Sequence, residues 1–313
     1  MSPVIELRGL TKVFGSKWFG SRRAVDDLTC SIEPGVVTGF LGPNGAGKST
    51  TMRMIVGLDR PTAGTATIGG RNYHALHHPL RTVGALLDAS QVHPNRTARH
   101  HLRWIAASNR VSAKRVDEVL AMVGLADAAG RKAGTFSLGM SQRLGIAAAL
   151  LGDPPVLIFD EPVNGLDPEG IRWVRTLMRT MADEGRTVFV SSHLLAEMAN
   201  IADRLVVIGR GKLIAATTMS DFLSRSDTVR VRSPRPDALR DVLTRAGLEV
   251  HGDGAALLVS GGTIEQVGEL AAGHGVTLHE LSPKPASLEE AYMELTDDSV
   301  DYRADYRPSG VPS

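Results

Sequence analysis

Residues 42–50 decide the fold of this chain, and they read Gly42, Pro43, Asn44, Gly45, Ala46, Gly47, Lys48, Ser49 and Thr50. They match the pattern G-x-x-x-x-G-K-[ST], a loop that holds phosphate groups. Its glycines let the backbone curl so that several N–H groups point at one anion. Lys48 adds a cation for the β- and γ-phosphates, and the Ser49 hydroxyl is a ligand for Mg²⁺. The preceding residues predict a buried strand over 36–41, and the following ones predict a helix whose N-terminus faces the phosphates.

Composition narrows the class of protein. The 313 residues are enough for a large core and two domains. Lys and Arg number 35 against 34 for Asp and Glu, and this balance gives no reason to expect nucleic-acid binding. A single cysteine, Cys30, cannot form an internal disulfide and suits a reducing cytosol. No apolar run approaches the roughly 20 residues that span a bilayer, so work at a membrane would require a partner.

Strand and helix signals alternate along residues 1–219. The expected strands, besides residues 36–41, are 5–7, 28–32, 65–68, 83–87, 156–159, 187–190, 205–208 and 213–216, with a basic, aromatic loop at 17–23. This alternation predicts an α/β domain built on a parallel sheet. Residues 97–151 instead show only helical periodicity, with Ser112 and Ser137 as N-caps, and predict a helical insert over about residues 88–151.

A smaller α+β accessory domain is expected over residues 220–296. Its predicted elements are a strand at 228–232, a helix at 236–246, strands at 248–251 and 256–260, a helix at 263–272 and a strand at 276–281. This βαββαβ order is the ferredoxin-like arrangement. Ser287 is expected to cap a last helix that ends at Leu295, and residues 297–313 are expected to form a disordered tail.

Two acids end an apolar stretch downstream of the phosphate loop. Residues 156–159 read as a strand, and Asp160 and Glu161 follow it. In a parallel sheet these acids would lie at the carboxyl edge, beside the phosphate loop. Asp160 is placed there to hold Mg²⁺, and Glu161 is placed to polarise an attacking water.

Over about residues 4–218, these motifs resemble those of the nucleotide-binding subunits of ATP-binding cassette (ABC) transporters. The resemblance implies a P-loop NTPase with a RecA-like core, an antiparallel β-subdomain and a helical subdomain. Around the nucleotide it implies that Phe14 is the aromatic residue that stacks on adenine and that His193 contacts the γ-phosphate. It also implies that Asp160 and Glu161 are the Walker B acids and that Asp167 belongs to the D-loop at 164–167. Because the first loop is long, Trp18 and Phe19 are alternatives to Phe14.

Two positions depart from the common family pattern. The signature reads Phe-Ser-Leu-Gly-Met over residues 136–140, and it retains Ser137 and Gly139 at a helix N-terminus that would bind the ATP of the opposite subunit. This form resembles the branch of drug and antibiotic exporters that includes the daunorubicin- and bacitracin-resistance ATPases. The Q-loop glutamine is replaced by Asp88, which can still bind Mg²⁺ or water, and Gln91 is the alternative.

The resemblance also implies the activity and the partners. ATP and Mg²⁺ are the expected ligands, and hydrolysis would drive a separate membrane permease that holds the protein at the cytoplasmic face of the membrane. A second ATP-binding subunit, expected to be another copy of this chain or else a close relative of it, would complete each site. Export of drugs, antibiotics or other hydrophobic compounds is the favoured role. An importer ATPase and a soluble regulatory ABC ATPase remain open.

Overall fold

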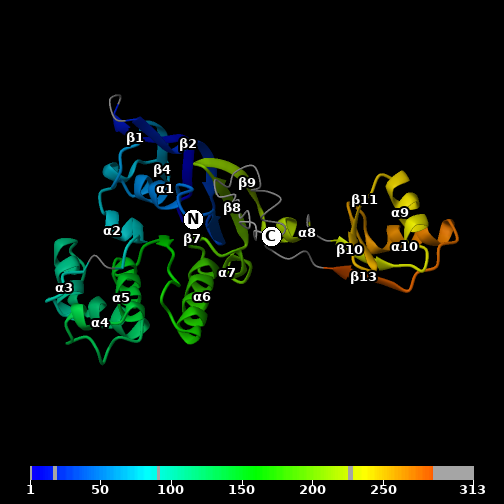
Figure 1. The fold of residues 1–313 in the computed structure, drawn as a ribbon. Helices are drawn as coiled ribbons and strands as arrows, with labels where there is room; N and C mark the ends of the chain where they lie inside the picture. Colours follow the sequence, from blue (N-terminus) through cyan, green and yellow to red (C-terminus); the bar gives the residue numbers. More distant parts are fainter. Residues whose placement is uncertain (1, 17–19, 90–91, 225–227, 285–313) are drawn as a thin grey trace, which may run out of the picture. The chain divides into compact units, whose positions relative to one another are not determined.

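The computed structural model describes residues 2–16, 20–89, 92–224 and 228–284. Its contacts divide the chain into two compact units, with the break between Ala216 and Thr217 (Figure 1). We call the first unit the cassette and the second the C-terminal domain. Within the described residues, no helix is both long enough and apolar enough to cross a bilayer.

The cassette is organised around a six-stranded sheet in the order β5-β6-β7-β3-β8-β9. Its strands are β3 (Val37–Leu41), β5 (Val83–Leu86), β6 (Val156–Asp160), β7 (Thr187–Ser192), β8 (Arg204–Gly209) and β9 (Lys212–Thr218). The pairs from β5 to β8 are parallel. Because helices cover both faces of the parallel part of this sheet, β3 and β7 are buried along their whole length, including the polar residues Thr38, Ser191 and Ser192.

Helices cover both faces of this sheet. On one face Met52 and Ile55 of α1 (Lys48–Ile55) share a core with Phe40 and Phe189. Gly39 points to the opposite face, where a Cβ would lie 2.7 Å from the sulfur of Met198 in α7 (Leu195–Ala199). The longer helix α6 (Pro168–Asp183) contacts β3 and β7. A 3₁₀ turn at Tyr73–Ala75 and the short α2 (Pro79–Thr82) precede β5.

A three-stranded antiparallel sheet, β2-β1-β4, forms the other layer of the cassette. It consists of β1 (Ile5–Ser16), β2 (Gly20–Ile32) and β4 (Ala63–Ile68). The prediction of short strands around a loop at 17–23 was wrong in its bounds, because residues 20–23 belong to β2. Register shifts near Leu10 and Lys12 break the two-residue apolar period, so the sequence pattern did not follow the hairpin to its exposed end.

Between β5 and β6 the cassette carries a group of helices, as expected. These are α3 (Ala98–Ser108), α4 (Ala113–Met122), a 3₁₀ turn at Ala133–Thr135 and α5 (Leu138–Leu150). The two predicted N-caps are confirmed: the Ser112 hydroxyl accepts from the Lys114 N–H, and the Ser137 hydroxyl accepts from the Met140 N–H. Each cap satisfies a backbone N–H that the helix leaves without an internal partner.

The C-terminal domain begins with α8 (Met219–Ser224) and then follows the βαββαβ order. Its elements are β10 (Thr228–Arg232), α9 (Pro236–Arg245), β11 (Glu249–Asp253), β12 (Ala256–Ser260), α10 (Ile264–Gly273) and β13 (Glu280–Lys284). The sheet is antiparallel in the order β11-β12-β10-β13. Alternate residues of these strands, such as Val229 and Val231, share a core with Leu239 and Val267 of the helices.

One strand of this domain was predicted too early. The apolar alternation predicted a strand at 276–281, whereas β13 pairs with β10 only over Glu280–Lys284. Val276 and Leu278 do pack against the core, so their alternation reports burial rather than pairing. The predicted helix from Ser287 to Leu295 and the predicted tail lie outside the described residues.

Candidate active site

The phosphate loop has a backbone that only glycine supports at two positions. Gly47 has a φ of 106°, and a Cβ there would lie 2.4 Å from the carbonyl oxygen of Ala24. At Gly42 a Cβ would lie 2.5 Å from the carbonyl oxygen of Ile208. The glycines of the pattern are therefore required both by the left-handed turn and by the close approach of neighbouring strands.

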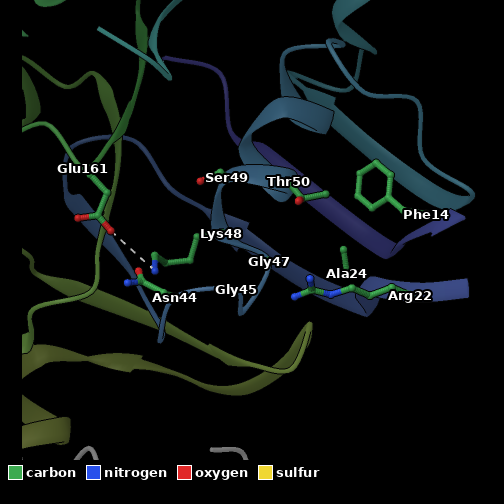
Figure 2. A pocket seen from close by; sticks show the side chains of 10 residues that line it. All are labelled: Phe14, Arg22, Ala24, Asn44, Gly45, Gly47, Lys48, Ser49, Thr50 and Glu161. Carbon is green, nitrogen blue, oxygen red and sulfur yellow. Dashed lines mark ion pairs between the residues drawn. The ribbon is translucent and has the colours of Figure 1, made fainter. Parts of the chain in front are cut away.

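This loop borders a pocket of about 310 Å³ (Figure 2). The residues that line it are Phe14, Arg22, Ala24, Asn44, Gly45, Gly47, Lys48, Ser49, Thr50 and Glu161. Phe14 is 42% exposed and lines the pocket, and the ammonium group of Lys12 lies 4.9 Å from the centre of its ring. No sequence motif identifies Arg22 and Ala24 as lining residues, because their place in the pocket depends on the register of the β1–β2 hairpin.

Lys48 is a buried cation between the loop and an acid. Its ammonium group donates to the carbonyl oxygen of Gly42 at 2.6 Å and lies 3.8 Å from Oε1 of Glu161. Burial lowers the pKa of Lys48, while the charges of Glu161 and Asp160 act in the opposite direction. Figure 2 shows the side chain directed from the loop toward Glu161.

The two acids at the carboxyl end of β6, Asp160 and Glu161, are held by hydrogen bonds from neighbouring elements. The Ser191 hydroxyl donates to Asp160 and accepts from the Glu161 N–H at 3.0 Å. The Gln142 amide donates to the carbonyl oxygen of Glu161 at 3.0 Å. Glu161 has a φ of 49°, which is uncommon for a residue with a side chain. Strained backbone of this kind gathers at functional sites, and here it coincides with the acid that the sequence singled out.

His193 completes a cluster at the carboxyl edge of the sheet. It follows β7, and its Nδ1 lies 2.8 Å from Oε2 of Glu161. Lys48, Glu161 and His193, which are far apart in the sequence, therefore meet through one carboxylate. The strand order brings them together because β3, β6 and β7 are adjacent and end at the same edge.

Other predicted site residues lie elsewhere in the cassette. Among the described residues, the lining of this pocket does not include Asp88, Ser137, Gly139 or Asp167. Ser137 caps α5, and Asp167 caps α6 through the Gly170 N–H at 2.8 Å. A Cβ on Gly139 would lie 3.2 Å from the carbonyl oxygen of Gly165, so the signature segment contacts the D-loop of its own chain. Trp18, Phe19 and Gln91 lie outside the described residues.

The donor chemistry near the loop fits Mg²⁺ only in part. Within the described ranges, no group of three or more His, Cys, Asp or Glu side chains is arranged to hold a metal. Mg²⁺ in phosphate sites, however, is commonly bound by one or two carboxylates together with phosphates of the substrate. Asp160 at the strand end and the exposed Ser49 match that partial set. Asp88 follows β5, the strand that pairs with β6.

The sequence and the fold place this chain among known proteins. A family model described as ABC transporter matches residues 25–164, and one described as a domain of unknown function matches residues 227–289. The chain is 36% identical over 300 residues to the uncharacterized ABC transporter ATP-binding protein YhcH of Bacillus subtilis (strain 168). This alignment covers 95% of this chain and 97% of that protein.

A second relative has a functional name. The bacitracin transport ATP-binding protein BcrA of Bacillus licheniformis is 36% identical over 305 residues, 94% of this chain and 98% of its own length. A solved dimeric structure of a bacterial ABC transporter cassette matches with a TM-score of 0.63 and 25% identity, over 69% of this chain and 98% of that one. The chain belongs to the family of ABC transporter ATP-binding proteins, and the resemblance inferred from its motifs is confirmed. It is an ABC ATPase.

Proposed function

We propose that this ABC ATPase drives the export of antibiotics or other hydrophobic compounds through a separately encoded membrane permease. Two features support export. The signature segment around Ser137 resembles that of the drug-exporter branch, and one relative over nearly the full length is a bacitracin transport ATP-binding protein. Importers and soluble regulatory ATPases are the alternatives. A permease gene beside that of this chain, with no binding-protein gene, would favour export.

The observation that carries the assignment of the site is the convergence of Lys48, Glu161 and His193 beside the phosphate loop. The loop N–H groups and Lys48 would bind the phosphates of ATP, and Phe14 would stack on the adenine. Glu161 would accept the proton of a water that attacks the γ-phosphorus while the bond to the bridging oxygen breaks. His193, held against Glu161, would orient that carboxylate and contact the γ-phosphate.

Asp160 and Ser49 are the residues proposed to hold Mg²⁺, with Asp88 as a further candidate. Mg²⁺, when bound, would neutralise negative charge on the phosphates. Ser191 keeps the Asp160 carboxylate at the strand end, and hydrogen bonds to the carbonyl oxygens of Gly42 and Pro43 keep the Lys48 ammonium group directed into the loop. The chain's own part in the chemistry is therefore to fix the phosphates and to place a base beside the reacting phosphorus.

We further propose that two copies complete each other's sites. Ser137 and Gly139 do not line the pocket of their own chain, and a helix N-terminus is suited to bind an anion brought by another subunit. Each site would thus combine the P-loop of one copy with the signature segment of the other. Binding of ATP would close the two copies on each other, and the helical group α3–α5 would transmit this movement to the permease at the cytoplasmic face of the membrane. The contacts with the cargo would lie in the permease.

Replacement of Glu161 tests the proposed mechanism. Glu161→Gln keeps the shape but removes the base, so we expect ATP binding to persist while turnover falls about 10²-fold or more. Glu184→Gln is the matched control, because Glu184 pairs with Arg186 on the surface after α6. Steady-state ATPase assays and equilibrium nucleotide binding measure the two effects. Normal turnover in Glu161→Gln would remove this residue from the mechanism.

A further inference from the structure

A second cation, Arg22, reaches the pocket from the β1–β2 hairpin. Arg22 lies directly opposite Phe14 in the antiparallel pairing, so the two side chains share one face of the hairpin. A guanidinium nitrogen of Arg22 is 3.4 Å from the point where a Cβ on Gly45 would stand. Figure 2 shows Lys48 directed toward Glu161, whereas Arg22 extends toward the loop from β2. The loop is therefore approached by positive charge from two directions.

Within the described part of the chain, the Arg22 side chain makes no ion pair and no hydrogen bond, although its neighbours do. Arg23 binds Asp26 at 2.6 Å, and Lys12 donates to the carbonyl oxygen of Arg60 at 2.7 Å. The Arg22 guanidinium instead lies beside Gly45. Gly45 belongs to the phosphate loop, which is rich in N–H donors and precedes the positive end of α1. A cation is unfavourable next to such donors unless an anion lies between them.

We infer that Arg22 binds the phosphate chain of the nucleotide and raises the affinity of this site for ATP and ADP. Lys48 is only partly available for that task, because it donates to the carbonyl oxygen of Gly42 and lies 3.8 Å from Glu161. A guanidinium group offers a planar pair of donors that fits two phosphate oxygens at once. The inference rests on the proposed nucleotide site, and it adds a residue that none of the recognised motifs contains.

Equilibrium binding of ATP, ADP and adenosine to the full chain tests this inference. Arg22→Gln should weaken ATP and ADP binding about tenfold, as expected for the loss of one charge-assisted contact, and should leave adenosine binding unchanged. Arg22→Lys, which keeps the charge but not the planar pair of donors, should give an intermediate affinity. The same loss should appear as a higher KM for ATP at an unchanged kcat, because the contact is made before and during the reaction.

Two control variants make the outcome decisive. Arg23→Gln removes the neighbouring cation, which is already paired with Asp26, and should leave ATP affinity at the wild-type value. Lys48→Ala tests the nucleotide site itself. If Lys48→Ala loses ATP binding while Arg22→Gln keeps it, the role of Arg22 is wrong and the site stands. If Lys48→Ala also binds ATP normally, the proposed site fails. If Arg22→Gln weakened the binding of adenosine as much as the binding of ATP, the proposed contact between Arg22 and the phosphates would be overturned.

Discussion

The cassette and the C-terminal domain each bury a sheet under helices, yet among the described residues only the cassette gathers reactive side chains at one sheet edge. In the cassette the parallel strands β3, β6 and β7 end at one edge, and Lys48, Glu161 and His193 meet beyond it. The antiparallel strands of the C-terminal domain send their ends to alternate edges. Strand direction, rather than composition, decides whether residues far apart in sequence converge on one site.

Charges in the two regions are also used differently. In the C-terminal domain Arg230 is neutralised by Asp253 and by Glu280, the latter at 2.7 Å, on the sheet itself. In the cassette the cations Lys48 and Arg22 border an open pocket. We therefore expect substitutions of the residues that border this pocket to alter ATP chemistry, whereas those in the C-terminal domain should alter only its own stability and its contacts.

The largest effect is expected from Ser137→Arg. The long cation would block the γ-phosphate bound by the partner, so hydrolysis should fall about 10³-fold, while ATP affinity of the monomer stays nearly intact. Ser112→Arg is the matched control, because Ser112 also caps a helix of the insert and its loss costs only about 1 kcal/mol of stability. Steady-state ATPase rates would check both variants. Full activity of a strictly monomeric protein would contradict the shared site.

A smaller effect concerns Cys30, the one cysteine of the chain, which lies in β2 of the cassette. Burial raises the pKa of this thiol to about 12, so little reactive thiolate is present near neutral pH. At pH 8 a thiol reagent should label the native protein about 10²-fold or more slowly than the urea-unfolded chain. Labelling at equal rates would mean that this sheet opens readily in the native cassette.

Two glycines with positive φ allow the regions to be compared by stability. Gly47→Ala should destabilise the cassette by more than about 2 kcal/mol, because the left-handed strain is joined by a clash with Ala24. Gly254 in the C-terminal domain has a φ of 61° and open space around it, so Gly254→Ala should cost only about 1 kcal/mol. Urea unfolding measures both. Equal costs would show that the clash at the loop relaxes.

The sequence predicted the parts of the site that depend on fixed local spacing. The loop from Gly42 to Thr50 and the acids at the end of β6 belong to such motifs, and the caps at Ser112 and Ser137 follow from single side chains. The sequence could not predict those features of the site that depend on strand register and on tertiary contacts. Arg22 enters the pocket only because the β1–β2 hairpin pairs it with Phe14.

Tertiary contacts also account for the strained conformation of Glu161. Its backbone is bound from two elements, since its N–H donates to Ser191 and its carbonyl oxygen accepts from Gln142. No pattern near residue 161 contains that information, because both partners come from distant segments. The same reasoning explains β13, where the apolar alternation from Val276 reflects burial, and pairing with β10 covers only Glu280–Lys284.

The most direct test of the account is ATP binding by the chain truncated after Ser220. The cassette supplies every residue that lines the pocket, so the truncated protein should bind ATP with the affinity of the full chain. We expect the loss of the C-terminal domain to weaken self-association or coupling to the permease instead. Slow labelling of Cys30 would verify that the cassette is folded. A folded truncation that no longer binds ATP would contradict the claim that the nucleotide chemistry belongs to the cassette alone.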